Sequence, residues 1–107
     1  AHGHYTKLPQ FDFDRLEKIA KEAKIPLVLH GGSGTPEADL KRAISLGMAK
    51  VNVATDCVRA WWETIDAQRK AGRNLWLPIA LTEAMQNVSR QVERWLVMTG
   101  AAGKARK

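Results

Sequence analysis

A short apolar run that ends on a histidine and passes into a glycine-rich turn constrains the fold of this chain most strongly. The run covers Pro26–His30, and the turn Gly31–Gly34 follows it directly. Short apolar runs bounded by turn residues are typical of buried strands. After the turn, Thr35 is suited to cap a helix and Pro36 to occupy its first position. The segment therefore predicts a strand joined to a helix, with His30 at the carboxyl end of the strand.

Apolar residues at helical spacing predict four helices along the chain. The first contains residues 16–23 and is stopped by Pro26, the second covers about 36–46 and ends at Gly47, and the last runs over about 79–98. A further strand is predicted over 49–55, directly before the third helix. The inward positions that we expect are Val58, Trp61, Trp62 and Ile65 in the third helix and Leu81, Met85, Val88, Val92, Trp95 and Leu96 in the last.

This order of elements predicts an α/β fold with parallel strands joined by right-handed crossovers. The predicted strands are too few to form a sheet covered on both faces, and no strand precedes His2. Residues 1–107 are therefore either an unusually small α/β domain or a piece of a larger domain, and the missing first strand favours a piece, with 100–107 as a mobile basic tail. Because such a piece exposes the flanks of its strands, we expect the isolated chain to self-associate or to be poorly soluble.

Composition narrows the possible partners. The formal net charge is +6, but Lys104, Arg106 and Lys107 supply three of these charges in a tail without acidic residues. Neither a basic stripe interleaved with aromatic residues nor an apolar run of about 20 residues is present, so we expect no nucleic-acid partner and no membrane span. The single Cys57 has no internal disulfide partner, which favours a reducing compartment and predicts a cytoplasmic protein with Cys57 in a packing role.

Three segments at predicted strand ends carry the polar chemistry: His2-Gly3, His30–Ser33 and Asn52–Thr55. Parallel strands place their carboxyl ends at one edge, so these segments should meet there. Imidazole nitrogen suits zinc, and backbone amides of a glycine turn at a helix start suit a phosphate. Each feature alone has a plain structural explanation, since a Gly-Ser turn is often only a connection and a strand-end histidine is often only hydrogen-bonded. Together they predict a metal beside a phosphate.

The same segments resemble the carboxyl-terminal part of class II, zinc-dependent ketose-bisphosphate aldolases, with the fructose- and tagatose-1,6-bisphosphate branch as the nearest match. The resemblance covers essentially the whole chain. It lies in Ala1–Tyr5, Phe11–Leu16, Pro26–Gly34, Lys50–Asp56 and Gly100–Ala105. It implies a fold consisting of about strands 6–8, with their helices, of a (β/α)8 TIM barrel.

The resemblance also implies roles for individual residues. His2 and His30 would be zinc ligands, while the dihydroxyacetone-phosphate site would be lined by Gly3, Gly31, Gly32, Ser33, Asn52, Val53, Ala54 and Thr55. In this family zinc polarises the substrate ketone, and a carboxylate handles the proton on the aldehyde-derived oxygen. The third zinc histidine and the catalytic aspartate of the family lie in an earlier loop, so we expect no catalytic residue in this chain. His4 is an alternative third ligand at a position that the family does not use, and Asp56 is interpreted as a helix N-cap.

The implied function is therefore part of a class II aldolase that reversibly cleaves a fructose or tagatose 1,6-bisphosphate to dihydroxyacetone phosphate and glyceraldehyde 3-phosphate. The implied cofactor is Zn²⁺, with a monovalent cation left open. The implied partners are the sugar bisphosphate, the amino-terminal part of the barrel and further copies in a homo-oligomer. The alternative is a non-catalytic remnant that binds sugar phosphate or zinc, or acts only in assembly.

Overall fold

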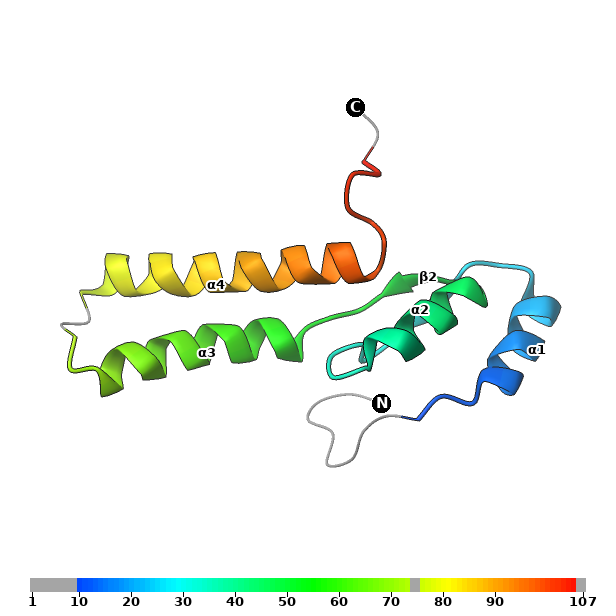
Figure 1. The fold of residues 1–107 in the computed structure, drawn as a ribbon, viewed down its shortest axis with the longest axis horizontal. Helices are drawn as coiled ribbons and strands as arrows, with labels where there is room; N and C mark the ends of the chain where they lie inside the picture. The colour runs from blue at the N-terminus through cyan, green and yellow to red at the C-terminus, as the bar shows by residue number, and fades with distance from the viewer. Residues whose placement is uncertain (1–9, 74–75, 106–107) are drawn as a thin grey trace. The chain divides into compact units, whose positions relative to one another are not determined.

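The computed structural model describes residues 10–73 and 76–105, which form an α/β arrangement of four helices and a two-stranded parallel sheet (Figure 1). The chain divides into two compact units, residues 1–54 and 55–107. The first contains α1 (Phe13–Ala23), β1 (Leu27–Leu29), α2 (Glu37–Ser45) and β2 (Met48–Val51). The second contains α3 (Thr55–Lys70) and α4 (Leu77–Met98). Both predicted strands exist, but each is shorter than the apolar pattern suggested.

The helix α1 ends before Pro26, as its local sequence predicts, and begins at Phe13. The carboxylate of Asp12 caps it by accepting a hydrogen bond of 2.9 Å from the backbone N–H of Arg15. At the other end Lys24 adopts the left-handed conformation and terminates the helix before Pro26. Lys21 forms a 2.8 Å ion pair with Glu17 one turn earlier and lowers the pKa of that carboxyl group. The apolar residues that were predicted to face inward within residues 16–23 are only partly buried, because Leu16 is enclosed whereas Ile19 is 46% exposed.

The prediction of Thr35 as the helix cap is wrong. The cap of α2 is Pro36, whose ψ of 138° is extended and which makes no side-chain capping bond. Thr35 belongs instead to the preceding turn, where its N–H donates to the carbonyl of Gly32 at 3.1 Å. A proline one residue before the helix fixes φ but leaves ψ free, so the helix begins at Glu37.

Packing in the first unit centres on α2. Leu40 and Ala43 are fully buried, and the guanidinium of Arg42 lies 4.1 Å from the ring centroid of Phe13 on α1. Gly47 directly follows the α2 cap with φ of 113°, and a Cβ at this position would lie 3.3 Å from the Cβ of Ala20. Glycine is therefore required where α2 turns toward β2 close to α1.

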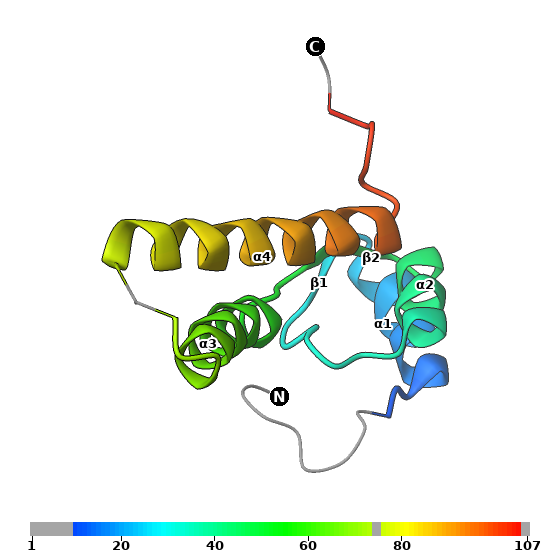
Figure 2. The ribbon, with the colours of Figure 1, turned by 60° about the vertical axis from the view of Figure 1, so that its left-hand side comes forward.

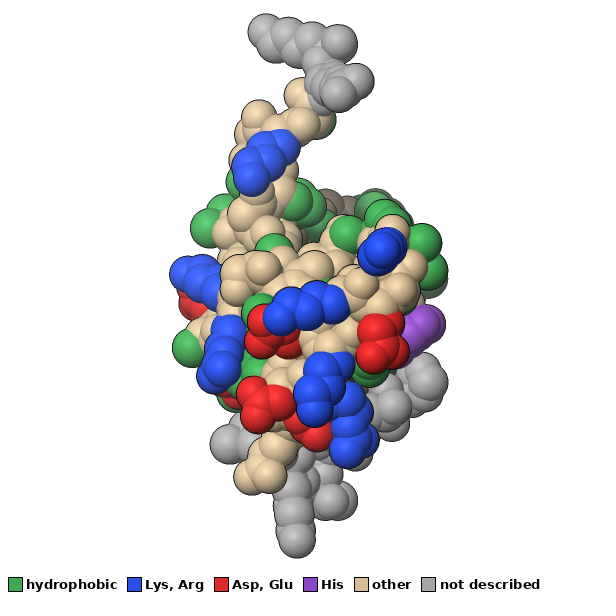
Figure 3. All heavy atoms as spheres, turned by 90° about the vertical axis from the view of Figure 1, so that its right-hand side faces the viewer, with side chains coloured by type: hydrophobic (Ala, Val, Ile, Leu, Met, Phe, Trp, Pro, Cys, Tyr) green, Lys and Arg blue, Asp and Glu red, His purple; other side chains and the backbone are tan. Residues whose placement is uncertain are grey.

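The face of the molecule in Figure 3 carries acidic and basic side chains in alternation rather than one sign of charge. On α2, for example, Lys41 pairs with Glu37 one turn away at 2.5 Å. Among the described residues, no helix combines the length and apolar character needed to cross a membrane.

The helices α3 and α4 form an antiparallel pair, which both ribbon views show (Figures 1 and 2). The predicted inward stripes are largely wrong here. Trp95 is buried as expected, but Val58, Trp62, Met85, Val92 and Leu96 are each more than 40% exposed. The buried positions are instead Asp56, Ala60 and Gln68 on α3 and Ala80 and Ala84 on α4. Small alanines let the helices approach closely, so the large apolar residues lie on neighbouring faces.

Candidate active site at the strand ends

The sheet brings His30 and Asn52 together. His30 directly follows β1 and Asn52 directly follows β2, and the parallel register pairs Leu29 with Val51 just before them. The side-chain amide nitrogen Nδ2 of Asn52 lies 3.1 Å from Nδ1 of His30. The proximity of these two side chains, predicted from the strand ends alone, is confirmed. This contact explains the polar residue within the Val51–Val53 run, because a polar group there needs a partner.

The backbone holds Asn52 in place on both sides of His30. Its N–H donates to the carbonyl of Leu29 at 2.9 Å, and its carbonyl accepts from the N–H of Gly32 at 2.9 Å. Gly31 lies between these bonds with φ of 66°, a left-handed conformation that glycine adopts without steric cost. The chain can therefore turn back immediately after His30. Two backbone bonds and one side-chain contact fix Asn52 against this turn.

The other predicted phosphate-binding residues lie in or beside this turn, or just after β2. Ser33 is buried at 6% exposure and Gly32 is also enclosed. Val53 is half-buried and Ala54 is exposed, while Thr55 is the first residue of α3 in the second unit. The amide of Gly32 donates to Asn52, so any anion bound at this turn would be held by other groups. His2, Gly3 and the alternative ligand His4 lie outside the described residues.

The donor chemistry at His30 fits one ligand of a zinc site. Its imidazole is exposed and carries a nitrogen of the kind that zinc prefers. Its Nδ1 lies 3.1 Å from the amide nitrogen of Asn52, which is a donor, whereas a metal-binding histidine usually donates its second ring N–H to an acceptor. The described residues contain no group of three His, Cys, Asp or Glu side chains that could hold a metal ion. The described part of the chain therefore supplies a single candidate ligand.

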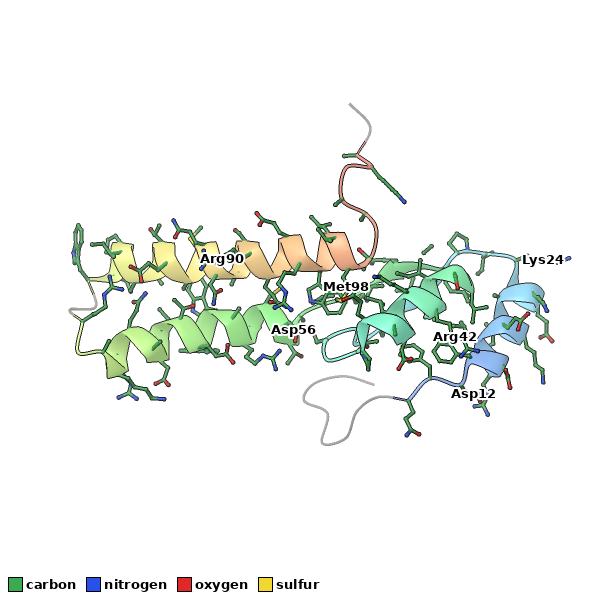
Figure 4. The ribbon with its side chains drawn as sticks, viewed as in Figure 1. Asp12, Lys24, Arg42, Asp56, Arg90 and Met98 are labelled. Carbon is green, nitrogen blue, oxygen red and sulfur yellow. The ribbon has the colours of Figure 1, made fainter. Side chains whose placement is uncertain are left out.

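A buried carboxylate at the start of α3 was not predicted from the sequence as an interaction centre. Asp56 lies inside the first turn of α3, so its interpretation as the N-cap is wrong. One of its oxygens accepts a 3.1 Å hydrogen bond from the indole Nε1 of Trp95, and the other accepts a 2.9 Å bond from Arg59 (Figure 4 labels Asp56). Asp56 and Trp95 are 39 residues apart, so no local pattern could reveal this pair.

A polar groove also runs along α3 and α4, lined among others by Thr64, Gln68, Glu83 and Asn87. Its side chains bond to one another. Glu83 accepts from both Gln68 and Arg73, and Asn87 donates to Thr64 and to the carbonyl of Ala60. These contacts join the two helices, so we interpret the groove as part of the packing between α3 and α4.

Comparisons with known proteins agree with this arrangement. Residues 1–104 match the model of the family described as "Fructose-bisphosphate aldolase class-II". The chain is 38% identical over 107 residues to the 6-phospho-5-dehydro-2-deoxy-D-gluconate aldolase of Bacillus subtilis, covering 99% of this chain and 37% of that protein. It is 37% identical over 105 residues to the aldolase of the same name from Shouchella clausii, covering 97% of this chain and 36% of that protein.

Among solved structures, the YdjI aldolase from Escherichia coli K12 superposes with a TM-score of 0.83 at 31% sequence identity. That match covers 92% of this chain and 37% of the YdjI chain. The chain thus spans little more than a third of the length of the relatives it matches, and its fold is that of part of a TIM barrel. On the family match over nearly its whole length, the chain belongs to the class II fructose-bisphosphate aldolase family.

Proposed function

We propose that this chain supplies the metal- and phosphate-binding side of an aldolase that reversibly cleaves a ketose phosphate and releases dihydroxyacetone phosphate. The observation that carries the proposal is the pair His30 and Asn52, held 3.1 Å apart at adjacent strand ends in a member of an aldolase family. In parallel α/β barrels this edge of the sheet is where substrates bind.

In the proposed site, His2 and His30 hold a zinc ion. The ion would supply Lewis-acid stabilisation of the enediolate oxygen that develops at the substrate ketone. Gly31 and Ser33 of the turn and the segment Asn52–Thr55, together with Gly3, would bind the phosphate and hydroxyl groups of the dihydroxyacetone-phosphate half, while the Gly32 amide stays bonded to Asn52. We assign no general base among the described residues, and the family resemblance implies that a carboxylate outside them handles the proton on the aldehyde-derived oxygen.

The candidate substrates share one half. Fructose and tagatose 1,6-bisphosphates, which the sequence resemblance favours, carry a ketone next to a phosphorylated carbon. The compound in the name of the Bacillus and Shouchella relatives, 6-phospho-5-dehydro-2-deoxy-D-gluconate, carries the same group at its other end. Retro-aldol cleavage of each yields dihydroxyacetone phosphate, together with glyceraldehyde 3-phosphate from the bisphosphates and malonate semialdehyde from the gluconate. The residues assigned above would bind the common half, so selection among these substrates belongs to residues that contact the aldehyde half.

An NMR titration of the 107-residue chain tests the binding proposal. With dihydroxyacetone phosphate at about 10 mM, enough to detect a millimolar Kd, we expect backbone amide shifts at Gly31, Ser33 and Asn52. Amides of α1 on the far side of α2 serve as the internal control and should not move. Inorganic phosphate should shift a subset of the same signals more weakly, because it lacks the hydroxyl groups. Shifts confined to the α3–α4 groove, or no shifts at all, would contradict the proposed site.

A further inference from the structure

The second unit contains a buried carboxylate directly beside a residue that we propose to bind phosphate. Thr55 is the first residue of α3, and Asp56 follows it in the first turn of the helix. Asp56 is 7% exposed, whereas Thr55 is half-buried. A carboxylate repels a phosphate at short range, so the direction in which Asp56 points affects phosphate binding at Thr55.

Two side chains of the second unit hold the Asp56 carboxylate, one at each oxygen. Oδ1 accepts a 2.9 Å hydrogen bond from Nη2 of Arg59, three residues later on α3. Oδ2 accepts a 3.1 Å bond from Nε1 of Trp95 in the last turn of α4. Antiparallel packing brings the end of α4 to the start of α3, and Figure 4 labels Asp56 and Met98 at this end of the helix pair. The carboxylate is therefore directed toward Arg59 and α4.

A carboxylate in the first turn of a helix competes with a phosphate for the same donors. The first N–H groups of a helix have no acceptor within the helix. Carboxylates and phosphates are both stabilised at this end, and aspartate side chains readily accept hydrogen bonds from nearby backbone N–H groups. If the Asp56 carboxylate were released from its partners, it would compete with a phosphate bound at Thr55.

Trp95 is better suited than Arg59 to fix the direction of this carboxylate. The indole is 7% exposed and enclosed in the helix pair, so it cannot move without opening the packing. Its N–H is a donor only, so it orients an acceptor without offering a competing one. Arg59 is 55% exposed and also lies 3.8 Å from Glu63. Arg59 therefore balances the charge of Asp56, while Trp95 sets its direction.

We propose that Trp95 is a positioning residue for phosphate binding at the start of α3. By holding Oδ2 of Asp56, it keeps the carboxylate away from the first-turn amides and from a phosphate at Thr55. Trp95 acts through Asp56 and does not touch the substrate. This inference rests on the proposed function, because it requires that Thr55 contacts the phosphate of dihydroxyacetone phosphate.

Removal of the indole donor, with and without the charge of Asp56, tests the proposal. The measurement is the Kd of the 107-residue chain for dihydroxyacetone phosphate, from NMR titration. Trp95→Phe should weaken binding roughly fivefold, the size of a charge effect at a helix end. Adding Asp56→Asn should restore the parent Kd, because a neutral amide does not repel phosphate. A merely structural role of Trp95 predicts the opposite, since a second change in the buried pair would weaken binding further.

Trp62→Phe is the control for the loss of an indole. Trp62 lies on the same helix as Asp56 but is 63% exposed, so this variant should keep the parent Kd. Circular dichroism of each variant verifies that the helices form. Inorganic phosphate, used as a second probe, should give the same order of affinities, because the proposed competition concerns the phosphate group alone.

Arg59→Gln tests the same carboxylate from the surface, where a substitution does not disturb the packing, and it decides the matter if Trp95→Phe does not fold. It should weaken binding because the charge of Asp56 is no longer balanced, and Asp56→Asn should restore binding. Glu63→Gln is the matched control, since it restores the net charge without changing Asp56 and should not restore binding.

The outcomes separate this inference from the proposed function. Unchanged binding in a folded Trp95→Phe chain would overturn the inference, as would failure of Asp56→Asn to restore binding in either background. Equal recovery with Glu63→Gln and Asp56→Asn would also overturn it, because net charge alone would then explain the effect. A parent chain that does not bind dihydroxyacetone phosphate would contradict the proposed function itself, and the inference with it.

Discussion

Replacing Trp95 with alanine is expected to lower the free energy of unfolding of the chain by about 3–5 kcal/mol, the usual loss for a buried tryptophan. Trp95 is 7% exposed and is the largest side chain buried in the α3–α4 pair. Its removal leaves a cavity and also deletes the donor that bonds to Asp56 Oδ2 at 3.1 Å. Because Asp56 is itself buried, the loss of a partner adds to the cost of the cavity. Urea unfolding followed by circular dichroism, at one fixed protein concentration, measures the change.

The chain offers a matched control for this prediction. Trp62 on α3 is 63% exposed, so Trp62→Ala should cost no more than about 1 kcal/mol. Trp95→Phe retains most of the apolar volume and isolates the hydrogen bond, with an expected loss of about 1–3 kcal/mol. Equal destabilisation by the Trp62 and Trp95 alanine variants would show that the helix pair is not organised around the Trp95–Asp56 contact.

Replacing His30 with alanine is expected to abolish zinc binding and to reduce aldol cleavage by on the order of 1,000-fold or more. Losing a polar group that merely supports a metal ligand already costs about 10–100-fold, and the loss of the ligand should exceed this. Both effects are measured in a chimera of the Bacillus subtilis relative, in which this chain replaces the matching 37% of that protein. Metal content by mass spectrometry and the rate of dihydroxyacetone phosphate release give two independent measurements.

Lys41→Ala provides the control in the same chimera. Lys41 is an exposed α2 residue paired with Glu37, so its removal should change neither metal content nor rate. Full zinc occupancy in the His30→Ala chimera would contradict the assignment of His30 as a ligand. A lower rate of cleavage with unchanged zinc content would show that His30 acts in substrate binding or in the structure of the turn, and not as a metal ligand.

Local signals in the sequence predicted the first unit well. The stop of the first helix before Pro26 and the end of the second at Gly47 each depend on neighbouring residues, so the sequence shows them directly. The prediction of Thr35 as the cap of α2 was wrong because two candidate capping residues, Thr35 and Pro36, are adjacent. The backbone of Thr35 forms the preceding turn, and Pro36 is the cap. Strand lengths were overestimated, since apolar runs continue into the turns that follow them.

In the second unit, the helical periodicity of apolar residues did not determine which faces of α3 and α4 pack against each other. Both α3 and α4 carry an apolar stripe of large residues beside a stripe of alanines and polar groups, and the helices pack through the second kind. A stripe of large residues predicts that a face is buried, but not against which partner. The same limit applies to the pair Asp56 and Trp95, which only the antiparallel packing of the helices brings together.

At the candidate site, the position of strand ends predicted the meeting of His30 and Asn52, because parallel pairing of the strands follows from the order of elements. The bond from the Gly32 amide to the Asn52 carbonyl was not foreseen, since it depends on the path of the chain through Gly31. The family resemblance added the roles of the individual residues, which neither spacing nor composition supplies.

The rate at which the chimera releases dihydroxyacetone phosphate tests the central claim most directly. If this chain carries the metal- and phosphate-binding side of an aldolase, the chimera should cleave 6-phospho-5-dehydro-2-deoxy-D-gluconate, lose that activity with a chelator and regain it with zinc. Parallel assays with fructose and tagatose 1,6-bisphosphates would show how far the aldehyde half selects the substrate. A folded chimera that binds zinc but neither binds dihydroxyacetone phosphate nor cleaves any of the three compounds would contradict the account.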